Sequence, residues 1–354
     1  MKTKKSWETW ISQSRIIKRY QKQILQFIKD YETDMEEISL NFYNSVGVKI
    51  ISNSRYLANE IRRDFWYFQS LKDDYDVIIF LVDTKRDIQK INDLRPPKKS
   101  VLIRRTNFID EYVKGSLNFS SINIPFEKTL GVSISDADTN LRIDLIKNPG
   151  LCYYMILRSR IRALIAELLE RFGYYMIHGA ALDMDGYGIT FLSPPRFGKT
   201  TLSLILLQEG LLLLSDDCPL LHLDESGLQL LAFPIRPILS REFLGEKPIE
   251  LDHKKVVRST MLRTTIIPFI WYCKHSEFKK TDSDSVLDIL YATIVYQFTF
   301  GRRELPTEII QKRVNLLKWI KDNTEIYSLF MGSDREQLKN RLRYLLTVLR
   351  GRSY

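Results

Sequence analysis

The chain has 354 residues, of which 44% are hydrophobic and 27% are charged, a composition typical of a globular protein long enough for two domains. Its formal net charge of +10 is concentrated at the ends, because residues 1–30 hold eight Lys/Arg against two acids and residues 301–354 hold twelve against six. Such charge suits nucleic acid, an acidic partner or an anionic membrane face. No zinc finger, aromatic RNA-binding motif or glycine-rich basic tract accompanies it, so a solvated helix face is favoured over nucleic-acid binding.

The cysteines and the apolar runs indicate in which cellular compartment the protein is expected. Cys152, Cys218 and Cys273 are widely spaced and form no paired motif, which argues against a disulfide framework or a zinc site and favours the reducing cytoplasm. No apolar run reaches the ~18 residues of a spanning helix, and no signal core follows the basic start. We expect a cytoplasmic protein without a transmembrane segment.

The first 148 residues are predicted to form an α+β domain. Apolar residues recur at three- and four-residue spacing between Trp7 and Tyr31, with Lys and Arg between them, which predicts a basic amphipathic helix. We expect it to dock on its own domain; a membrane-surface or dimer helix is the alternative. A helix is also expected from Ser54 to Phe68, and strands are expected at Val46–Ser52, Val77–Asp83, Val101–Arg105, Asn118–Ile124 and Gly131–Ile134.

Asn148-Pro149-Gly150, a cluster of three helix breakers, marks the expected domain boundary. A helix is predicted from Leu151 to Phe172, with Gly173 as its cap. We assign residues 151–354 to a second domain.

The second domain begins with a hairpin, a loop and a helix. Apolar runs flank Asp185-Gly186, a dipeptide suited to the left-handed conformations of a tight turn. The next eight residues, from Ser193 to Thr200, match G-x-x-x-x-G-K-[ST] except at the first glycine, which is Ser193. A short helix, Thr201–Gln208, and a buried strand, Leu211–Leu214, follow; the strand ends at Ser215-Asp216-Asp217.

This order of elements predicts a site for ATP and Mg²⁺. Backbone N–H groups of the loop and the helix dipole attract phosphate. Lys199 is expected along the β/γ-phosphates and the Thr200 hydroxyl on Mg²⁺, with a carboxylate from the end of the neighbouring strand completing the metal site. The expected nucleotide-binding residues are Ser193, Pro194, Pro195, Arg196, Phe197, Gly198, Lys199, Thr200 and Thr201.

The remaining elements complete an α/β domain. A hairpin is expected over His222–Phe233, and the polar, basic residues 244–263 are expected to be a mobile segment over the site. Asp334 or Ser333 is expected to cap the last helix. The predicted strands are Thr264–Cys273 and Glu325–Met331, and the predicted helices are Val286–Phe298, Pro306–Lys321 and Arg335–Leu349.

Four segments together resemble the HPr-kinase-related proteins. These are His178-Gly179-Ala180-Ala181, the Pro-Pro-x-x-Gly-Lys-Thr-Thr loop, Leu214-Ser215-Asp216-Asp217 and Phe233-Pro234-x-Arg236-Pro237. The resemblance covers Ile177–Pro237 best. It implies the catalytic domain of HPr kinase/phosphorylase, a mixed sheet with flanking helices whose P-loop is distantly related to that of phosphoenolpyruvate carboxykinase.

The resemblance also implies roles. Asp216 would be the general base toward the acceptor hydroxyl, with His178 orienting it, and Asp217 would bind the metal with Thr200. Lys199, Arg236 and Arg241 would stabilise charge on the transferred phosphoryl. Against these roles stand plainer ones: an aspartate that caps a turn, a core histidine and a structural arginine.

The implied activity is transfer of the γ-phosphoryl of ATP to a hydroxyl, serine being expected, on a peptide or small protein, as in peptide natural-product maturation. The alternative is a non-catalytic nucleotide-binding regulatory module with a degenerate loop. The family loop usually has glycine where this chain has Arg196 and a small residue where it has Phe197. Arg196 would contact phosphate, face an acidic acceptor or obstruct the loop. The acceptor's identity and a homo-oligomeric state stay open.

Overall fold

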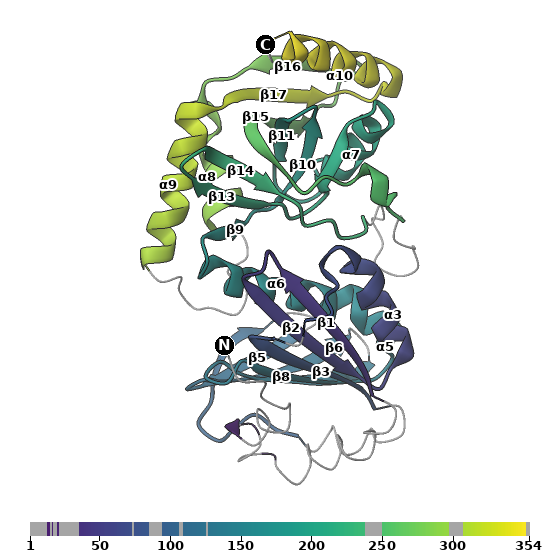
Figure 1. Ribbon diagram of the computed structural model, residues 1–354, viewed down its shortest axis with the longest axis vertical. Coiled ribbons are helices and arrows are strands. Elements are labelled where there is room, and N and C mark those ends of the chain that lie inside the picture. The colour runs from purple at the N-terminus through teal and green to yellow at the C-terminus, as the bar shows by residue number, and fades with distance from the viewer. Residues whose placement is uncertain are drawn as a thin grey trace. The chain divides into compact units, whose positions relative to one another are not determined.

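The chain forms two compact units, Met1–Ile165 with Phe300–Arg303 and Ala166–Thr299 with Glu304–Tyr354 (Figure 1). Both combine a large sheet with helices, which confirms the predicted mixture of α and β structure. The predicted boundary at residues 148–150 stays a prediction. This computed structural model describes residues 13, 14, 16, 20, 35–72, 74–84, 94–105, 109–124, 127–237, 250–296 and 307–351.

An eight-stranded sheet in the order β1-β2-β3-β8-β7-β6-β5-β4 forms the first unit. Its centre is parallel, because β3 pairs in parallel with both β2 and β8. These three strands are buried along their whole length. The strands are β1 (Glu36–Phe42), β2 (Val46–Ser52), β3 (Val77–Asp83), β4 (Val101–Arg105), β5 (Ile109–Lys114), β6 (Leu117–Ile124), β7 (Glu127–Asp136) and β8 (Leu141–Ile146).

Three strands of this sheet, β1, β5 and β8, are absent from the sequence prediction because charged residues interrupt their apolar pattern. In β8 the interruption is a buried pair. Arg142 donates from Nε to Asp144 Oδ2 over 2.7 Å and from Nη2 to Oδ1 over 3.0 Å. The two residues are two apart and therefore share a face of the strand, so each neutralises the other inside the sheet.

The helices of the first unit show why Asn148-Pro149-Gly150 begins a helix. Asn148 has a left-handed φ of 49°, its side chain accepts from Leu151 N, and Pro149 occupies the first helical turn. The predicted helix 151–172 is thereby confirmed with an earlier start. The helical elements are α3 (Arg55–Asp64), η2 (Trp66–Phe68), α5 (Pro149–Cys152), the π-helical turn η3 (Tyr153–Leu157) and α6 (Arg158–Glu170), whose residues from Ala166 on belong to the second unit.

Only part of the predicted N-terminal helix can be compared with the structure. Ile16 and Tyr20 are buried in the core of the first unit, and Ser14 Oγ donates to Asp136 Oδ2 over 3.1 Å. These contacts agree with docking on its own domain. The rest of the stretch between Trp7 and Tyr31 lies outside the described residues.

The second unit is built on a nine-stranded mixed sheet. The order is β12-β10-β11-β15-β14-β13-β9, with β17 paired to β15 and β16 paired to β17. The strands are β9 (Tyr174–Met176), β10 (Gly179–Met184), β11 (Tyr187–Leu192), β12 (Leu212–Ser215), β13 (Leu220–Asp224), β14 (Gly227–Leu231), β15 (Ser259–Ile270), β16 (Glu277–Lys280) and β17 (Glu325–Met331).

Strand direction decides which ends meet at one edge of this sheet. Both β11 and β12 are antiparallel to β10, which lies between them, so β11 and β12 run the same way. β15 is parallel to β11, and β17 is parallel to β15. The carboxyl ends of all four strands therefore lie along a single edge.

Two turns adopt the conformations that the sequence predicts. In the β10–β11 hairpin, Asp185 and Gly186 have φ of 54° and 87°, both left-handed as a tight two-residue turn requires. Gly173 ends the helix before β9 with φ of 78°.

Two helices cover one face of the second sheet. Leucines of α7 (Lys199–Gln208) and α10 (Arg335–Arg350) pack with apolar residues of β10, β11, β15 and β17 in a single core. Asp334 caps α10 by accepting from Gln337 N, as predicted. The other helical elements are η4 (His253–Lys255), η5 (Ser283–Val286), α8 (Leu287–Tyr291), the π-helical turn η6 (Ala292–Tyr296) and α9 (Thr307–Asn323).

The predicted segment over the site needs a correction. Ser259–Ile270 is one long strand, so the strand begins five residues before the predicted Thr264. Val257 N donates to Leu213 O, and Lys255 Nζ donates to Leu207 O, which holds the preceding residues against the sheet and α7. Residues 244–249, 297, 298 and 306 of the predictions lie outside the described residues. Among the described residues, no helix has both the length and the apolarity to cross a bilayer.

Arg313 on α9 supplies a test of what holds the second unit together. It is 1% exposed and donates from Nε to Glu170 Oε1 over 2.9 Å and from Nη1 to Ile294 O over 2.6 Å. Arg313→Ala should lower the free energy of unfolding by about 3–5 kcal/mol, because it leaves a buried carboxylate without its partner. Urea denaturation measures this. Lys312→Ala, which removes a surface pair, should leave the midpoint unchanged; equal midpoints for both variants would contradict the role of Arg313.

Candidate active site

The loop between β11 and α7 has the backbone of a phosphate loop. Arg196 and Gly198 both have left-handed φ, of 71° and 81°. The left-handed φ of Gly198 favours glycine, and a Cβ there would lie 2.8 Å from the flexible end of Met331, at Cε, which would have to shift. The left-handed φ at Arg196 also explains why glycine is usual at this position, and a non-glycine residue there costs roughly 1–2 kcal/mol.

The start of α7 presents a row of backbone N–H groups. Among the described residues, none of the N–H groups of residues 196–201 donates to a protein acceptor. Consecutive N–H groups of this kind, at the positive end of a ten-residue helix, attract an anion of phosphate size.

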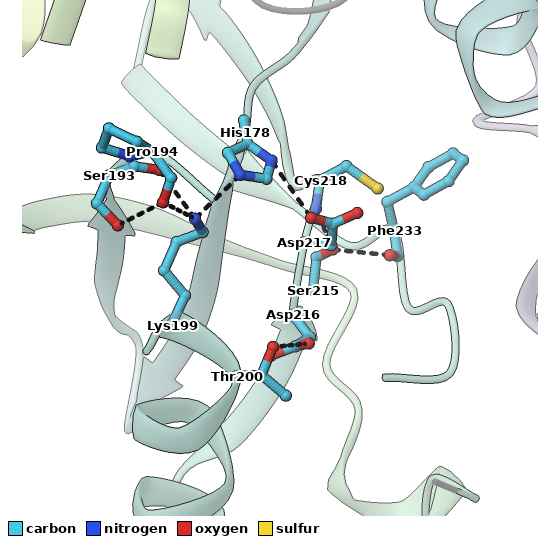
Figure 2. A network of polar contacts seen from close by, with 10 residues as sticks. All are labelled: His178, Ser193, Pro194, Lys199, Thr200, Ser215, Asp216, Asp217, Cys218 and Phe233. Atoms are coloured by element: carbon cyan, nitrogen blue, oxygen red, sulfur yellow. Dashed lines mark hydrogen bonds and ion pairs between the residues drawn. The ribbon is translucent and has the colours of Figure 1, made fainter. Parts of the chain in front are cut away.

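The Lys199 side chain lies between the start of this loop, at Ser193 and Pro194, and His178 (Figure 2). Its Nζ lies 2.8 Å from Ser193 O, 3.0 Å from Pro194 O and 3.0 Å from His178 Nε2, so all three ammonium protons have acceptors. The residue is 7% exposed, and burial lowers the pKa of its ammonium from 10.5 to about 8. Lys199 is therefore held charged and in place by groups that a phosphate could replace.

The contacts of His178 define its tautomer. Because an ammonium can only donate, Nε2 of His178 accepts from Lys199. The proton of the neutral ring is then on Nδ1, which lies 3.3 Å from Asp217 Oδ1. Gly179 N donates to Asp217 O over 3.1 Å, which holds the aspartate's backbone beside β10. Lys199, His178 and Asp217 thus form one chain of polar contacts.

Thr200 and Asp216 form the second half of the site. Thr200 Oγ1 donates to Asp216 Oδ2 over 2.8 Å. Asp216 is 4% exposed, and its Oδ1 makes no hydrogen bond with the part of the chain that the structure describes. Burial raises the pKa of this carboxyl from 3.8 to about 6, against the hydrogen bond from Thr200, which lowers it.

The Thr200–Asp216 pair fits Mg²⁺. Both side chains would offer oxygen atoms as metal ligands. A cation would also give the buried Oδ1 of Asp216 the partner that it lacks among the described residues. The described residues hold no group of three or more His, Cys, Asp or Glu side chains suited to a metal. Mg²⁺ in nucleotide sites binds through one or two carboxylates together with water and substrate phosphates.

Ser215, which sequence reasoning did not assign, anchors the aspartates. Its Oγ donates to Phe233 O over 2.8 Å and accepts from Cys218 N over 3.1 Å. A further bond runs from Phe233 N to Leu214 O. The segment before Arg236 is therefore joined to the end of β12, and the turn that carries Asp216 and Asp217 is braced on both sides (Figure 2). A serine directly before two aspartates was its only sequence signal.

The structure brings together Lys199, Thr200, His178, Asp216 and Asp217, but it pairs them differently from the expectation. His178 was expected to orient Asp216 and contacts Asp217 instead. Thr200 was expected to share the metal with Asp217 and contacts Asp216.

The other expected residues are less directly engaged. Arg236 is 2% exposed, and its Nη1 lies 3.3 Å from Glu250 Oε1, so a structural contact accompanies any role in the site. Within the loop, Ser193 is buried, Pro195, Arg196 and Thr201 are exposed, and Pro194 and Phe197 are half-buried. Arg241 lies outside the described residues.

Comparison with known proteins adds little. No known protein family and no curated protein matches the chain. The structure is similar to the HPr(Ser) kinase/phosphatase from Coxiella burnetii over 50% of this chain and 95% of that chain, with 14% identity and a TM-score of 0.28. So low a TM-score carries no argument, and we infer the function from the site's own residues.

The buried carboxylate predicts a pH-dependent stability. Between the unfolded pKa of 3.8 and the folded value of about 6, the folded state holds a proton that the unfolded chain has released, so stability falls as the pH rises through this range. At pH 7.5 the ionised Asp216 costs roughly 3 kcal/mol, at 1.36 kcal/mol per pKa unit.

Asp216→Asn should therefore raise the melting temperature at pH 7.5, without added divalent metal, and the gain should shrink at pH 4.5. Thermal unfolding of both proteins at the two pH values measures it. The exposed turn variant Asp185→Asn serves as the control and should change neither value. A gain that does not depend on pH would contradict the assignment to ionisation.

Proposed function

We propose that the protein is an ATP-dependent kinase that uses Mg²⁺ and transfers the γ-phosphoryl to a hydroxyl, serine being favoured, of a peptide or small protein. The observation that carries this proposal is the meeting of two motifs at one sheet edge. Lys199 and Thr200 begin the helix after β11, Asp216 and Asp217 follow β12, and the Thr200–Asp216 hydrogen bond joins the two.

Nucleotide binding follows from the free donors. The N–H groups of residues 196–201 would take the phosphate oxygens, and Lys199 would exchange one or more of its carbonyl acceptors for the β/γ-phosphates. Its buried ammonium makes a strong charge-assisted contact because little water competes there. Mg²⁺, when bound by Thr200 and Asp216 together with the nucleotide, would neutralise charge on the β- and γ-phosphates.

The exposure of the two aspartates favours a reversal of their expected roles. A proton acceptor must reach a hydroxyl that arrives from solvent, and the Asp217 side chain is 42% exposed, whereas Asp216 is buried. Asp217 is also the aspartate that His178 orients. We assign the general base to Asp217 and the metal side to Asp216.

These residues account for the proton and for the bonds that form and break in the transfer step. Asp217 takes the proton as the acceptor oxygen bonds to the γ-phosphorus, and the bond from that phosphorus to the bridging oxygen of ADP breaks. The Nδ1–H of His178 holds Asp217 in position, while Lys199 stays beside the leaving phosphate.

Arg196 decides between this kinase and a non-catalytic nucleotide-binding module. Its side chain is exposed, and it makes no hydrogen bond or ion pair with the described residues, so it does not fill the loop that it belongs to. Its backbone reproduces the left-handed conformation that glycine usually supplies there. This favours a working loop, with the guanidinium available to a phosphate or an acidic acceptor. A cytoplasmic setting, which agrees with three unpaired cysteines, completes the proposal.

Lys199 tests the function. Lys199→Met keeps the aliphatic stem but removes the charge, and it should weaken binding of ATP with Mg²⁺ by about tenfold or more, because a charge-assisted hydrogen bond is worth ~1.5–3 kcal/mol. Isothermal titration calorimetry measures the affinity, and transfer from γ-labelled ATP to a library of serine-containing peptides measures the activity. The exposed Lys254→Met is the matched control. Unchanged transfer by Lys199→Met would overturn the kinase assignment.

Substitutions of the two aspartates should differ in how they change the Mg²⁺ dependence of ATP binding. Asp217→Asn should retain Mg²⁺-dependent ATP binding and lose about 10²–10⁴-fold in transfer, as expected for removal of a general base. Asp216→Asn should instead weaken the dependence of ATP affinity on Mg²⁺. Titrations of ATP with and without Mg²⁺, together with single-turnover transfer, distinguish them; the opposite pattern would restore the roles that the sequence resemblance implied.

A further inference from the structure

A row of three basic side chains runs along one flank of α10. Arg335, Lys339 and Arg343 are four residues apart, so they follow one another along the helix, which begins at Arg335. Arg343 pairs with Glu209, and Lys339 pairs with Glu336 over 3.1 Å. Arg335 is exposed, and it forms no hydrogen bond or ion pair with the part of the chain that the structure describes. The row therefore ends in a cation that has no acidic partner among these residues.

This flank of α10 faces α7. Arg343 reaches across from α10 and donates from Nε and Nη2 to the two carboxylate oxygens of Glu209, each over 2.9 Å. Glu209 directly follows the last residue of α7. The hydrogen bond from Arg343 lowers the pKa of the Glu209 carboxyl, and the charge of Lys339 also lowers it. Two of the three basic side chains thus lie beside α7, and Arg335 is one turn from Lys339 on the same flank.

The two helices also meet at the phosphate loop. Both cover the same face of the sheet, and they follow β11 and β17, whose carboxyl ends lie along one edge. At that edge a Cβ on Gly198 would lie 2.8 Å from Cε of Met331, which is four residues before Arg335. Contacts therefore join α7 to the end of β17 at one end and to α10 at the other.

The lengths of the helices place Arg335 near the start of α7. From the pair of Glu209 with Arg343, Lys199 is ten residues back along α7, and Arg335 is eight residues back along α10. These steps are about 15 and 12 Å at a rise of 1.5 Å per residue. Arg335 is therefore nearly level with the first turn of α7, and Arg343 shows that an arginine on this flank can span the distance between the helices.

Helix electrostatics give no structural reason for a cation at Arg335. It is the first residue of α10, where the positive end of the helix dipole disfavours a positive side chain. The neighbouring N-cap, Asp334, already uses Oδ1 to accept from Gln337 N. An arginine at this place is better explained by an anion that binds in front of the two helices.

Strand order indicates which anion this is. β12, which precedes Asp217, lies beyond β10 on one side of β11, whereas β15, β17 and the start of α10 lie on the other side. The proposed acceptor hydroxyl arrives at Asp217, so the phosphate loop separates it from Arg335. The anion within reach of Arg335 is then the phosphate chain of the nucleotide rather than a carboxylate of the acceptor.

We propose that Arg335 binds the triphosphate of the nucleotide held by the phosphate loop, as a second cation in addition to Lys199. This rests on the proposed function and adds a binding residue to that site. Lys199 approaches from the side of His178, and Arg335 approaches from α10, so the phosphate chain would lie between two cations. The guanidinium would donate charge-assisted hydrogen bonds to phosphate oxygens, for which its planar fork is suited.

The test compares ATP with inorganic tripolyphosphate, each with Mg²⁺, by isothermal titration calorimetry. Arg335→Ala should weaken binding of both ligands by a similar factor, roughly tenfold, because the lost contact is to phosphate and not to the nucleoside. Arg341→Ala is the matched control. Arg341 is an exposed arginine of the same helix, but it lies two residues from Arg343 and therefore on the opposite side of α10. This variant should keep both affinities within twofold.

A conservative variant and a melting curve separate binding from folding. Arg335→Lys keeps the charge on a shorter side chain and should recover part of the affinity that Arg335→Ala loses. Arg335→Ala should not lower the melting temperature, because a cation in the first turn opposes the helix dipole. A lower melting temperature, together with binding as weak in Arg335→Lys as in Arg335→Ala, would assign the residue a structural role and overturn the proposal.

The remaining outcomes are distinguishable from those of the proposed function. If Arg335→Ala binds both ligands as tightly as the unaltered protein does, while Lys199→Met binds them weakly, the role of Arg335 is overturned and the phosphate site stands. If Arg335→Ala weakens ATP alone, or raises only the KM of an acceptor peptide, Arg335 contacts the nucleoside or the acceptor and the proposal is wrong. Binding of neither ligand to the unaltered protein overturns the proposed function and the role of Arg335 together.

Discussion

The site depends on the parallel direction of β11 and β12. A single antiparallel strand, β10, separates them, so both deliver their carboxyl ends to the same edge of the sheet. The helix between them begins at Lys199, which puts the first turn of that helix within hydrogen-bond reach of Asp216. If β12 ran the other way, the same residues would lie at opposite ends of the sheet.

The charges at this edge are held at a cost to stability. Lys199 and Asp216 are both buried, and burial shifts the pKa of each toward its neutral form. Neither would be retained for folding alone, because a buried charge stabilises only when its partners fully compensate its lost hydration. Perturbed groups of this kind concentrate at functional sites, where the substrate supplies the missing partner. Here a phosphate would replace a neutral acceptor of Lys199 with a charged one, and a cation would complete the contacts of Asp216.

The polar contacts divide the site into two arms with different exposure. Lys199, His178 and Asp217 form one arm, which ends at a half-exposed carboxylate; Thr200 and Asp216 form the other, which ends in the interior. The proposed transfer would use this division, because an incoming hydroxyl can reach the exposed Asp217 but not the buried Asp216. The hydrogen bonds of Ser215 to Phe233 and Cys218 hold the turn that carries the two aspartates in one conformation.

The sequence by itself determined the local elements and the chemical parts. The hairpin at Asp185-Gly186, the loop up to Lys199, the strand Glu325–Met331 and the cap at Asp334 follow from turn chemistry, periodicity and capping, which act over a few residues. Strand β8 escaped prediction because Arg142 and Asp144 interrupt its apolar pattern, and only the strand conformation puts the two side chains on one face, where they neutralise each other. The pairing of His178 with Asp217 and of Thr200 with Asp216 was likewise decided by the tertiary structure. Adjacent aspartates are equivalent in a sequence, and only the direction of their side chains, set by the sheet edge and the brace at Ser215, makes one buried and the other exposed.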